Sequence, residues 1–88
     1  MNDSRREFLI KYTEMITMKK YSPMTLKSYQ YHLIRFWNFK NAISIKNISS
    51  QDINDYLVCL NDSDVSDSYF NQAINAIRFF FKYVLNKK

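Results

Sequence analysis

Two sets of polar side chains recur at helical spacing, and both combine small polar groups with cations. The first set has gaps of three, four and three residues: Thr25, Ser28, His32 and Arg35. The second has gaps of four, three and four residues: Asn71, Asn75, Arg78 and Lys82. Either spacing puts its members on one face of an α-helix. Arg and Lys neutralise phosphates, Ser and Thr donate to them, and Asn or Arg can pair with base edges, so both sets suit nucleic acid.

The charges of the 88-residue chain, whose formal net charge is +5, are unevenly distributed. Residues 19–46 hold six basic side chains and no acidic one, and residues 68–88 hold four basic and no acidic ones. Residues 47–67 hold five Asp and no base. If the two acid-free segments lie side by side, they form one electropositive face for a polyanion, which is our expectation. Ordinary solvation of helix surfaces is the alternative explanation.

Four helices are predicted to position these sets, at about residues 4–18, 22–40, 49–60 and 66–85. Three of them follow a serine that is a favourable N-cap, namely Ser22, Ser49 and Ser66. In each segment apolar residues recur every three or four positions, and no alternating strand pattern competes with them. The linkers are short, so we expect an all-α fold, an orthogonal or antiparallel four-helix bundle.

The helix ends carry further local signals. Ser4 and Glu7 fit a capping box at the first helix. In a chain without Gly, Asn41 and Asn61 are expected to end the second and third helices.

Composition excludes several kinds of site. With no Gly, one Cys and one His, the chain has no Gly-rich phosphate loop, no internal disulfide and no credible set of metal ligands. No cofactor or metal is expected, and no apolar stretch could span a bilayer. Cys59 is expected to pack as a small hydrophobe. The Phe run at 79–81 exceeds what one helix face can bury, so Phe79 or Phe80 is expected at the rim of the core.

Three segments in order resemble a known family. Residues 21–29 read YSPMTLKSY and are followed by Leu33 and Phe36; residues 45–57 contain Asp52, Ile53, Tyr56 and Leu57; residues 71–85 read NQAINAIRFFFKYVL. Together they resemble the N-terminal core-binding domain of tyrosine recombinases, the phage integrases and Xer-type enzymes.

The resemblance implies a SAM-like four-helix domain that forms half of a clamp on DNA. In that family the second and fourth helices dock on the major groove of a recombination half-site, and the first helix often touches a neighbouring protomer. By position, the resemblance assigns DNA contacts to Thr25, Lys27, Ser28, His32, Arg35, Asn71, Asn75, Arg78 and Lys82. It implies double-stranded DNA, the recombinase catalytic domain and neighbouring protomers as partners. The location it implies is the bacterial cytoplasm, at the nucleoid, for a protein of bacterial or phage origin.

The family's catalytic domain follows this one and supplies the Arg, Lys and His cluster and the tyrosine nucleophile. This chain stops at Lys88, near where the interdomain linker would begin. None of its tyrosines has a convergent Arg pair that could activate it. We therefore expect residues 1–88 to form a single DNA-binding domain, monomeric in isolation and not an enzyme by itself.

Two alternatives stay open. A helical protein-interaction module would use the acidic segment and the rim at Phe79 and Phe80 as its working surfaces. A small helix-turn-helix regulator is disfavoured, because the linkers exceed the turn of about three or four residues in that motif and no short Gly-type turn joins two helices. In the DNA-binding interpretation the acidic segment is turned away from DNA, or pairs with a basic surface of another domain or protomer.

Overall fold

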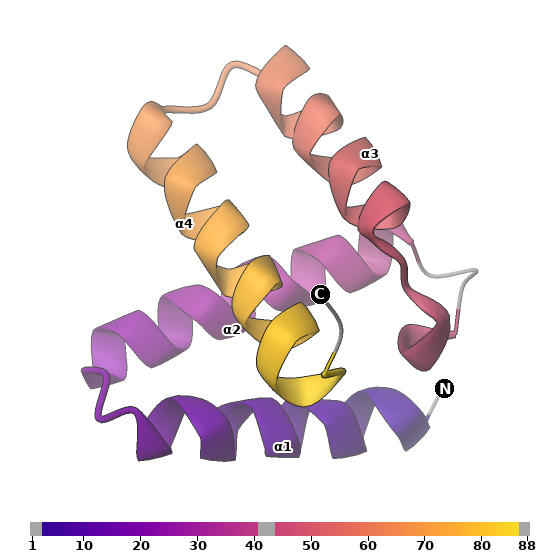
Figure 1. Cartoon of the computed structure of the whole chain (residues 1–88). Helices are drawn as coiled ribbons and strands as arrows, with labels where there is room; N and C mark the ends of the chain where they lie inside the picture. Colours follow the sequence, from indigo (N-terminus) through magenta and orange to yellow (C-terminus); the bar gives the residue numbers. More distant parts are fainter. Residues whose placement is uncertain (1–2, 41–43, 87–88) are drawn as a thin grey trace.

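The computed structural model describes residues 3–40 and 44–86, and within these ranges the chain forms helices and no strand (Figure 1). The α-helices are α1 (Asp3–Met18), α2 (Pro23–Phe39), α3 (Ser50–Asp62) and α4 (Asp67–Phe79). A 3₁₀ turn, η1 (Ile45–Asn47), precedes α3, and a π-helical segment, η2 (Phe80–Val84), continues α4. The predicted all-α fold of four helices is confirmed.

The three predicted serine caps are confirmed. The side chains of Ser22, Ser49 and Ser66 each accept a hydrogen bond from the backbone N–H three residues later. At α3 the Asp52 carboxylate also accepts a hydrogen bond from the Ser49 backbone N–H, which completes a capping box. These caps satisfy backbone donors that the first helical turn leaves unpaired. The Ser4 side chain, and with it the predicted capping box at α1, lies outside the described residues, as does Asn41.

The end of α3 differs from the prediction. The helix continues past Asn61 to Asp62 and is closed by Ser63. The Ser63 N–H bonds to the carbonyls of Cys59 and Leu60, and its hydroxyl donates to the Cys59 carbonyl over 2.9 Å. Because Ser63 satisfies these terminal carbonyls, Asn61 is not needed as a terminator and remains within the last turn.

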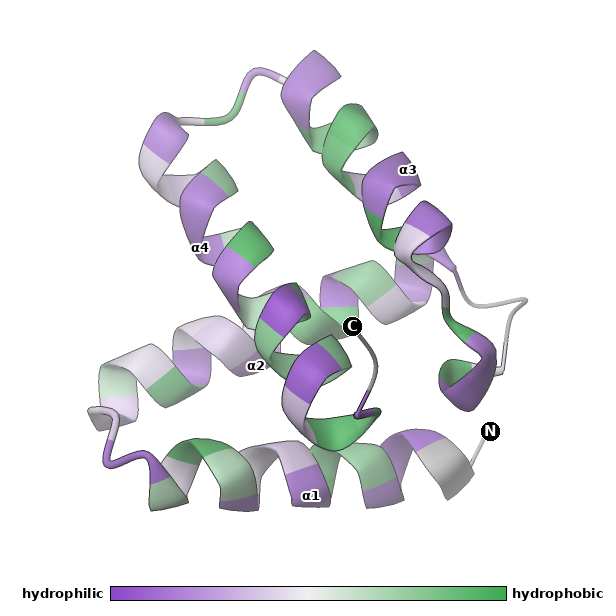
Figure 2. Ribbon diagram, in the orientation of Figure 1, coloured by the Kyte–Doolittle hydropathy of each residue, from purple (hydrophilic) through white to green (hydrophobic). Residues whose placement is uncertain are grey.

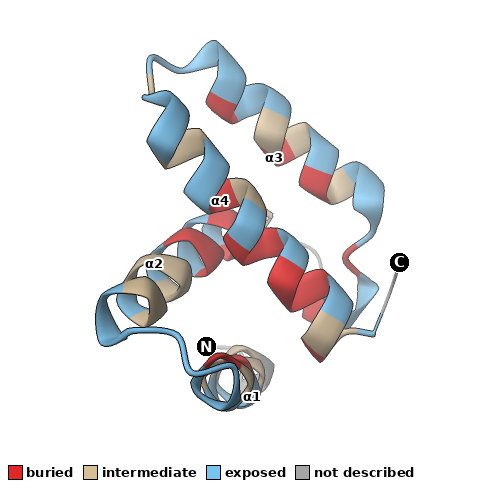
Figure 3. Cartoon of the chain, turned by 60° about the vertical axis from the view of Figure 1, so that its left-hand side comes forward, coloured by how far each residue is buried: buried red, intermediate tan, exposed pale blue. Residues whose placement is uncertain are grey.

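The helices form two antiparallel pairs that cross one another. Figures 1 and 3 show α1 beside α2, and α3 beside α4, with α4 crossing α2. At the crossing the Ser28 hydroxyl donates to Gln72 Oε1 over 2.9 Å, and the hydroxyls of Tyr69 and Tyr31 are 3.3 Å apart. The prediction that the two acid-free segments are neighbours is therefore confirmed.

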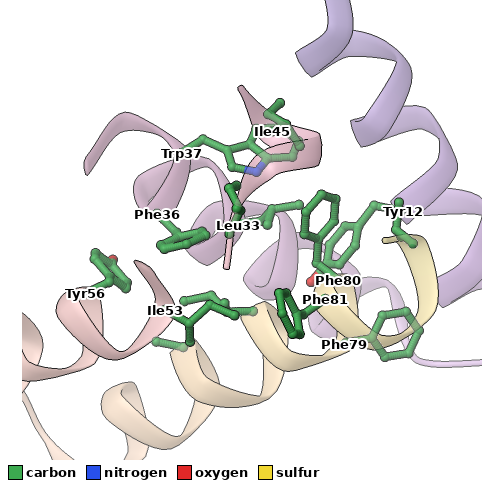
Figure 4. Close-up of a cluster of buried hydrophobic side chains, with 14 of the residues drawn as sticks. Tyr12, Leu33, Phe36, Trp37, Ile45, Ile53, Tyr56, Phe79, Phe80 and Phe81 are labelled. Carbon is green, nitrogen blue, oxygen red and sulfur yellow. The ribbon is translucent and has the colours of Figure 1, made fainter. Parts of the chain in front are cut away.

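All three residues of the Phe run are buried, which corrects the prediction of an aromatic rim. Phe79, Phe80 and Phe81 are exposed by only 6%, 1% and 9%. Figure 4 shows them pointing to different parts of the core. Phe79 packs against tyrosines at the start of α2, Phe80 against Trp37 and α1, and Phe81 beside Ile53 of α3. The exposed rim that a protein-interaction module would have used is absent.

Two features of the fold let one run of residues bury three rings. First, α4 passes into the π-helical segment, where the Leu85 N–H bonds to the Phe80 carbonyl five residues earlier. Second, α1, α2 and α3 surround this end of α4, so successive side chains each meet a different helix. Sequence periodicity shows which residues share one face of a helix. It could not predict that three other helices surround the end of α4.

Tyr12 ties α1 to α4 just before the π-helical segment. Its buried hydroxyl donates to the Ala76 carbonyl over 2.8 Å, and its ring meets both Phe79 and Phe80 edge-on. Burial raises the pKa of Tyr12 well above the usual tyrosine value, so the hydroxyl remains a donor.

Replacing Tyr12 by Phe tests this tie. Tyr12→Phe keeps the ring packing but removes the hydrogen bond, and we expect it to lower the free energy of unfolding by about 1 kcal/mol. The loss is small because the Ala76 carbonyl still accepts the Phe80 backbone N–H. Urea denaturation measures the change. Tyr21→Phe, at an exposed ring, is the control and should lose nothing; equal losses in both variants would contradict the assignment.

Candidate nucleic-acid interface

The second predicted set forms one exposed face along α4 and η2. The four residues of this face, which we name the α4 ridge, are Asn71, Asn75, Arg78 and Lys82, and all are exposed. One flank of α4 packs against α2 and the other against α3, so the ridge faces solvent (Figure 3). Figure 2 shows the corresponding hydrophilic bands along α4. The structure therefore brings all four predicted α4 residues together.

A hollow lies on each side of the ridge near its C-terminal end. Between α3 and α4 a groove of about 610 Å³ has Ile53 and Leu57 in its lining, together with Arg78 and Lys82. Between α4 and the start of α2 a second hollow of about 360 Å³ is lined by Tyr21 and the same two cations. Because the surface recedes on both sides, the C-terminal half of the ridge protrudes from the molecule.

The ridge itself contains no carboxylate. Asp67, the first residue of α4, is exposed and lies four residues before Asn71, at the N-terminal end of the ridge rather than within it. A carboxylate there is favoured by the helix dipole. Within the described ranges neither Arg78 nor Lys82 forms an ion pair with a carboxylate. Both cations are thus available to an anionic ligand.

The expectation that His32 lies on an exposed face is wrong, because its side chain is only 1% exposed. The predicted α2 set, to which His32 belongs, lies beside the apolar stripe of α2 rather than opposite it. Helix α4 packs over this side of α2. The His32 ring meets the Tyr69 ring edge-on, with ring centres 4.7 Å apart. His32 therefore packs between α2 and α4 and cannot contact DNA in this conformation.

The other α2 candidates differ in availability. Thr25 and Ser28 are half-buried, and each hydroxyl has a partner, Ser22 at 3.0 Å and Gln72 at 2.9 Å. Arg35 is exposed and stacks over the Tyr31 ring at 5.5 Å. Lys27 is exposed, and helical geometry places it about a third of a turn from Ser28, away from α4. Among the α2 candidates only Arg35 is an exposed cation on the α4 side.

Sequence reasoning missed a contribution from the turn between α1 and α2. Lys19 Nζ lies 4.7 Å from the centre of the Tyr83 ring, and Lys82 Nζ lies 5.3 Å from the same ring. With Arg78, these lysines gather three cations at the C-terminal end of the ridge. Lys19 opens the acid-free segment 19–46, so charge pattern was the available signal, but only the fold brings it to α4.

Part of the acidic segment pairs with a cation of the same chain. Lys40 Nζ lies 3.0 Å from Asp55 Oδ2 and 3.5 Å from Asp52 Oδ1. The Ser49 backbone N–H holds the pKa of Asp52 below its usual value, and Lys40 lowers it further. Lys40 is thereby partly neutralised and does not add to the ridge. Asp62 and Asp64 are exposed at the connection between α3 and α4.

Other kinds of site find no support among the described residues. No group of three or more His, Cys, Asp or Glu side chains could hold a metal ion there. Cys59 is exposed on α3 rather than packed, which corrects the expectation, since its neighbour Leu60 occupies the inward position. No helix in the described ranges is long and apolar enough to cross a membrane.

The burial of His32 predicts that the stability of the folded chain depends on pH. Burial lowers the pKa of His32, an effect that a side-chain hydrogen bond with Gln72 partly opposes and the Arg35 cation reinforces. Below about pH 6.5 the unfolded chain binds a proton that the folded chain resists, so stability present above that pH is lost as pH falls. The lowered pKa values of Asp52 and Asp55 affect the stability only below about pH 4, outside the range of this test.

We expect the melting temperature of the wild-type chain to fall between about pH 7.5 and pH 5, and to fall less for His32→Gln. Calorimetry or circular dichroism at both pH values measures this difference. The comparison uses each variant's own change with pH, so a lower overall stability of His32→Gln does not affect it. Identical pH dependence in the two chains would contradict the assigned burial.

Comparison with known proteins matches this arrangement to one family. A family model described as the phage integrase N-terminal SAM-like domain matches residues 8–88, almost the whole chain. Searches of curated proteins and of solved structures returned no match. In integrases this domain is a non-catalytic part of an enzyme of DNA integration and recombination. The chain belongs to the family of phage integrase N-terminal SAM-like domains.

Proposed function

We propose that this recombinase-associated domain binds duplex DNA, with the α4 ridge in the major groove and nearby cations on backbone phosphates. The observation that carries the proposal is the protruding ridge, which holds two amides and two cations and no carboxylate. A major groove about 12 Å wide admits one α-helix, and a helix with receding surface on both sides fits that shape.

The placement of cations around the ridge supports the same proposal. Arg35 lies beside Tyr31, whose hydroxyl meets Tyr69 near the N-terminal end of α4. Lys19 and Lys82 meet at Tyr83, near the C-terminal end. Phosphate rows border the groove on both sides, so cations near both ends of the inserted helix would reach them.

The proposal also assigns the protein partners and separates DNA binding from strand cleavage. We infer that residues 1–88 act as one DNA-binding domain, and that strand cleavage belongs to a recombinase catalytic domain. That catalytic domain and neighbouring recombinase protomers are the proposed protein partners, and the bacterial cytoplasm is the proposed location. A domain that supplies one half of a clamp binds DNA through few phosphates, so its affinity should be modest and salt-sensitive.

A fluorescence anisotropy titration of a labelled duplex tests DNA binding by the 88-residue chain. At about 50 mM salt we expect saturable binding, and at about 200 mM a loss of at least tenfold in affinity. The reason is that phosphate contacts release condensed counterions. Absence of binding at the lower salt concentration, or binding indifferent to salt, would overturn the proposal.

Charge-removing variants locate the contact surface. Arg78→Ala and Lys82→Ala should each weaken binding and reduce the salt slope by about one. Lys11→Ala removes the same charge from α1, away from the ridge, and should change binding little. The melting temperature should stay near wild type in all three, because each side chain is exposed. Equal effects of all three would indicate net charge rather than a defined surface.

Arg35→Ala tests the contribution of α2. We expect weaker DNA binding with a nearly unchanged melting temperature, since Arg35 is exposed and its stacking on Tyr31 is a surface contact. Thermal denaturation accompanies the titration. If the variant unfolds, Arg35 is a structural residue and its assignment as a contact is wrong.

A further inference from the structure

We propose that Asn75, with Asn71 one turn before it, reads adenine in the major groove, so that base specificity lies on α4. This inference rests on the proposed function and adds which residues choose the sequence and which base they choose. Asn and Gln amides can pair bidentately with N6 and N7 of adenine, and such a contact discriminates among bases. The question is which amides of this surface can make it.

Three amides on α4 are exposed, but they are not equally available. Gln72 Oε1 accepts the Ser28 hydroxyl over 2.9 Å. Gln72 is thereby engaged in holding α4 on α2. Within the described part of the chain, Asn71 and Asn75 have no such partner. Their donors and acceptors can therefore both be offered to a base.

The surroundings of Asn75 also favour base reading over a phosphate contact. It lies on the protruding ridge, in the lining of the hollow near Tyr21, three residues before Arg78. Arg78 and Lys82 are longer and charged, so they reach phosphates more readily than a short neutral amide does. Asn75 lies nearer the middle of the ridge, where an inserted helix approaches the base edges.

The α2 candidates cannot take over this role. His32 is buried, and the hydroxyls of Thr25 and Ser28 are engaged with Ser22 and Gln72. Arg35 and Lys27 remain exposed, but neither carries an amide, the group that pairs with adenine N6 and N7. Adenine reading by an amide therefore falls to α4.

A selection experiment tests the assignment with a pool of duplexes that carry a random central segment. The 88-residue chain is used as wild type, as Asn75→Ala and as Asn61→Ala, a matched control at an exposed position on α3. We expect wild type and Asn61→Ala to enrich adenine at a defined position, and Asn75→Ala to lose that preference. Circular dichroism should show the same melting temperature for all three.

A modified base then tests the pairing itself. In the selected duplex, 7-deazaadenine at the enriched position removes N7 without changing the base pair. We expect wild type to lose about 2- to 12-fold in affinity, the range for one lost hydrogen bond since N6 still pairs, and Asn75→Ala to lose nothing further. Lys82→Ala should weaken binding to both duplexes by the same factor, because a phosphate contact does not sense the base.

The outcomes separate this inference from the proposed function. If Asn75→Ala weakens binding equally to every sequence, the amide contacts phosphate and the adenine assignment is wrong. If Asn75→Ala retains the wild-type preference, or wild type binds with steep salt dependence but selects no sequence, the assignment is also wrong while DNA binding stands. If wild type binds no duplex at low salt, the proposed function itself fails and the inference falls with it.

Discussion

The packing of the aromatic run at the end of α4 is the constraint on which the rest of this domain depends. Phe79, Phe80 and Phe81 point into three parts of one core, and Tyr12 of α1 packs against the first two of these rings (Figure 4). A helix held by rings on several sides can neither roll nor slide without exposing one of them. The orientation of α4, and with it the direction of the ridge, follows from this anchoring.

With α4 fixed in this way, α2 and α4 present their polar residues differently. α4 turns Gln72 towards α2 and keeps Asn71 and Asn75 outside, although all three are amides on neighbouring turns. α2, in contrast, turns part of its polar stripe inward, where His32 meets Tyr69. The polar residues of α2 thus serve the helix crossing as much as any ligand. This asymmetry is why the proposed base contacts lie on one helix.

The fold also rearranges the charges that the chain carries. Lys40 is paired with Asp52 and Asp55, so one cation of the basic segment is neutralised locally. Lys19, from the turn after α1, joins Lys82 at Tyr83 instead. The positive end of the ridge is therefore assembled from separate parts of the chain. Net charge is compatible with a polyanion partner, but the surface proposed to bind it is a product of packing.

Local features were predictable from the sequence because their causes are local. A serine cap needs only the backbone three residues ahead, and an apolar stripe needs only the helical repeat, so Ser22, Ser49, Ser66 and the exposed ridge of α4 followed from the residues alone. The family resemblance was equally visible there. Whether His32, Cys59 and the Phe run are buried or exposed could not be predicted from the sequence, because it depends on which side of each helix a neighbouring helix covers. Periodicity tells which residues share a face, whereas only tertiary packing decides whether that face meets water or another helix.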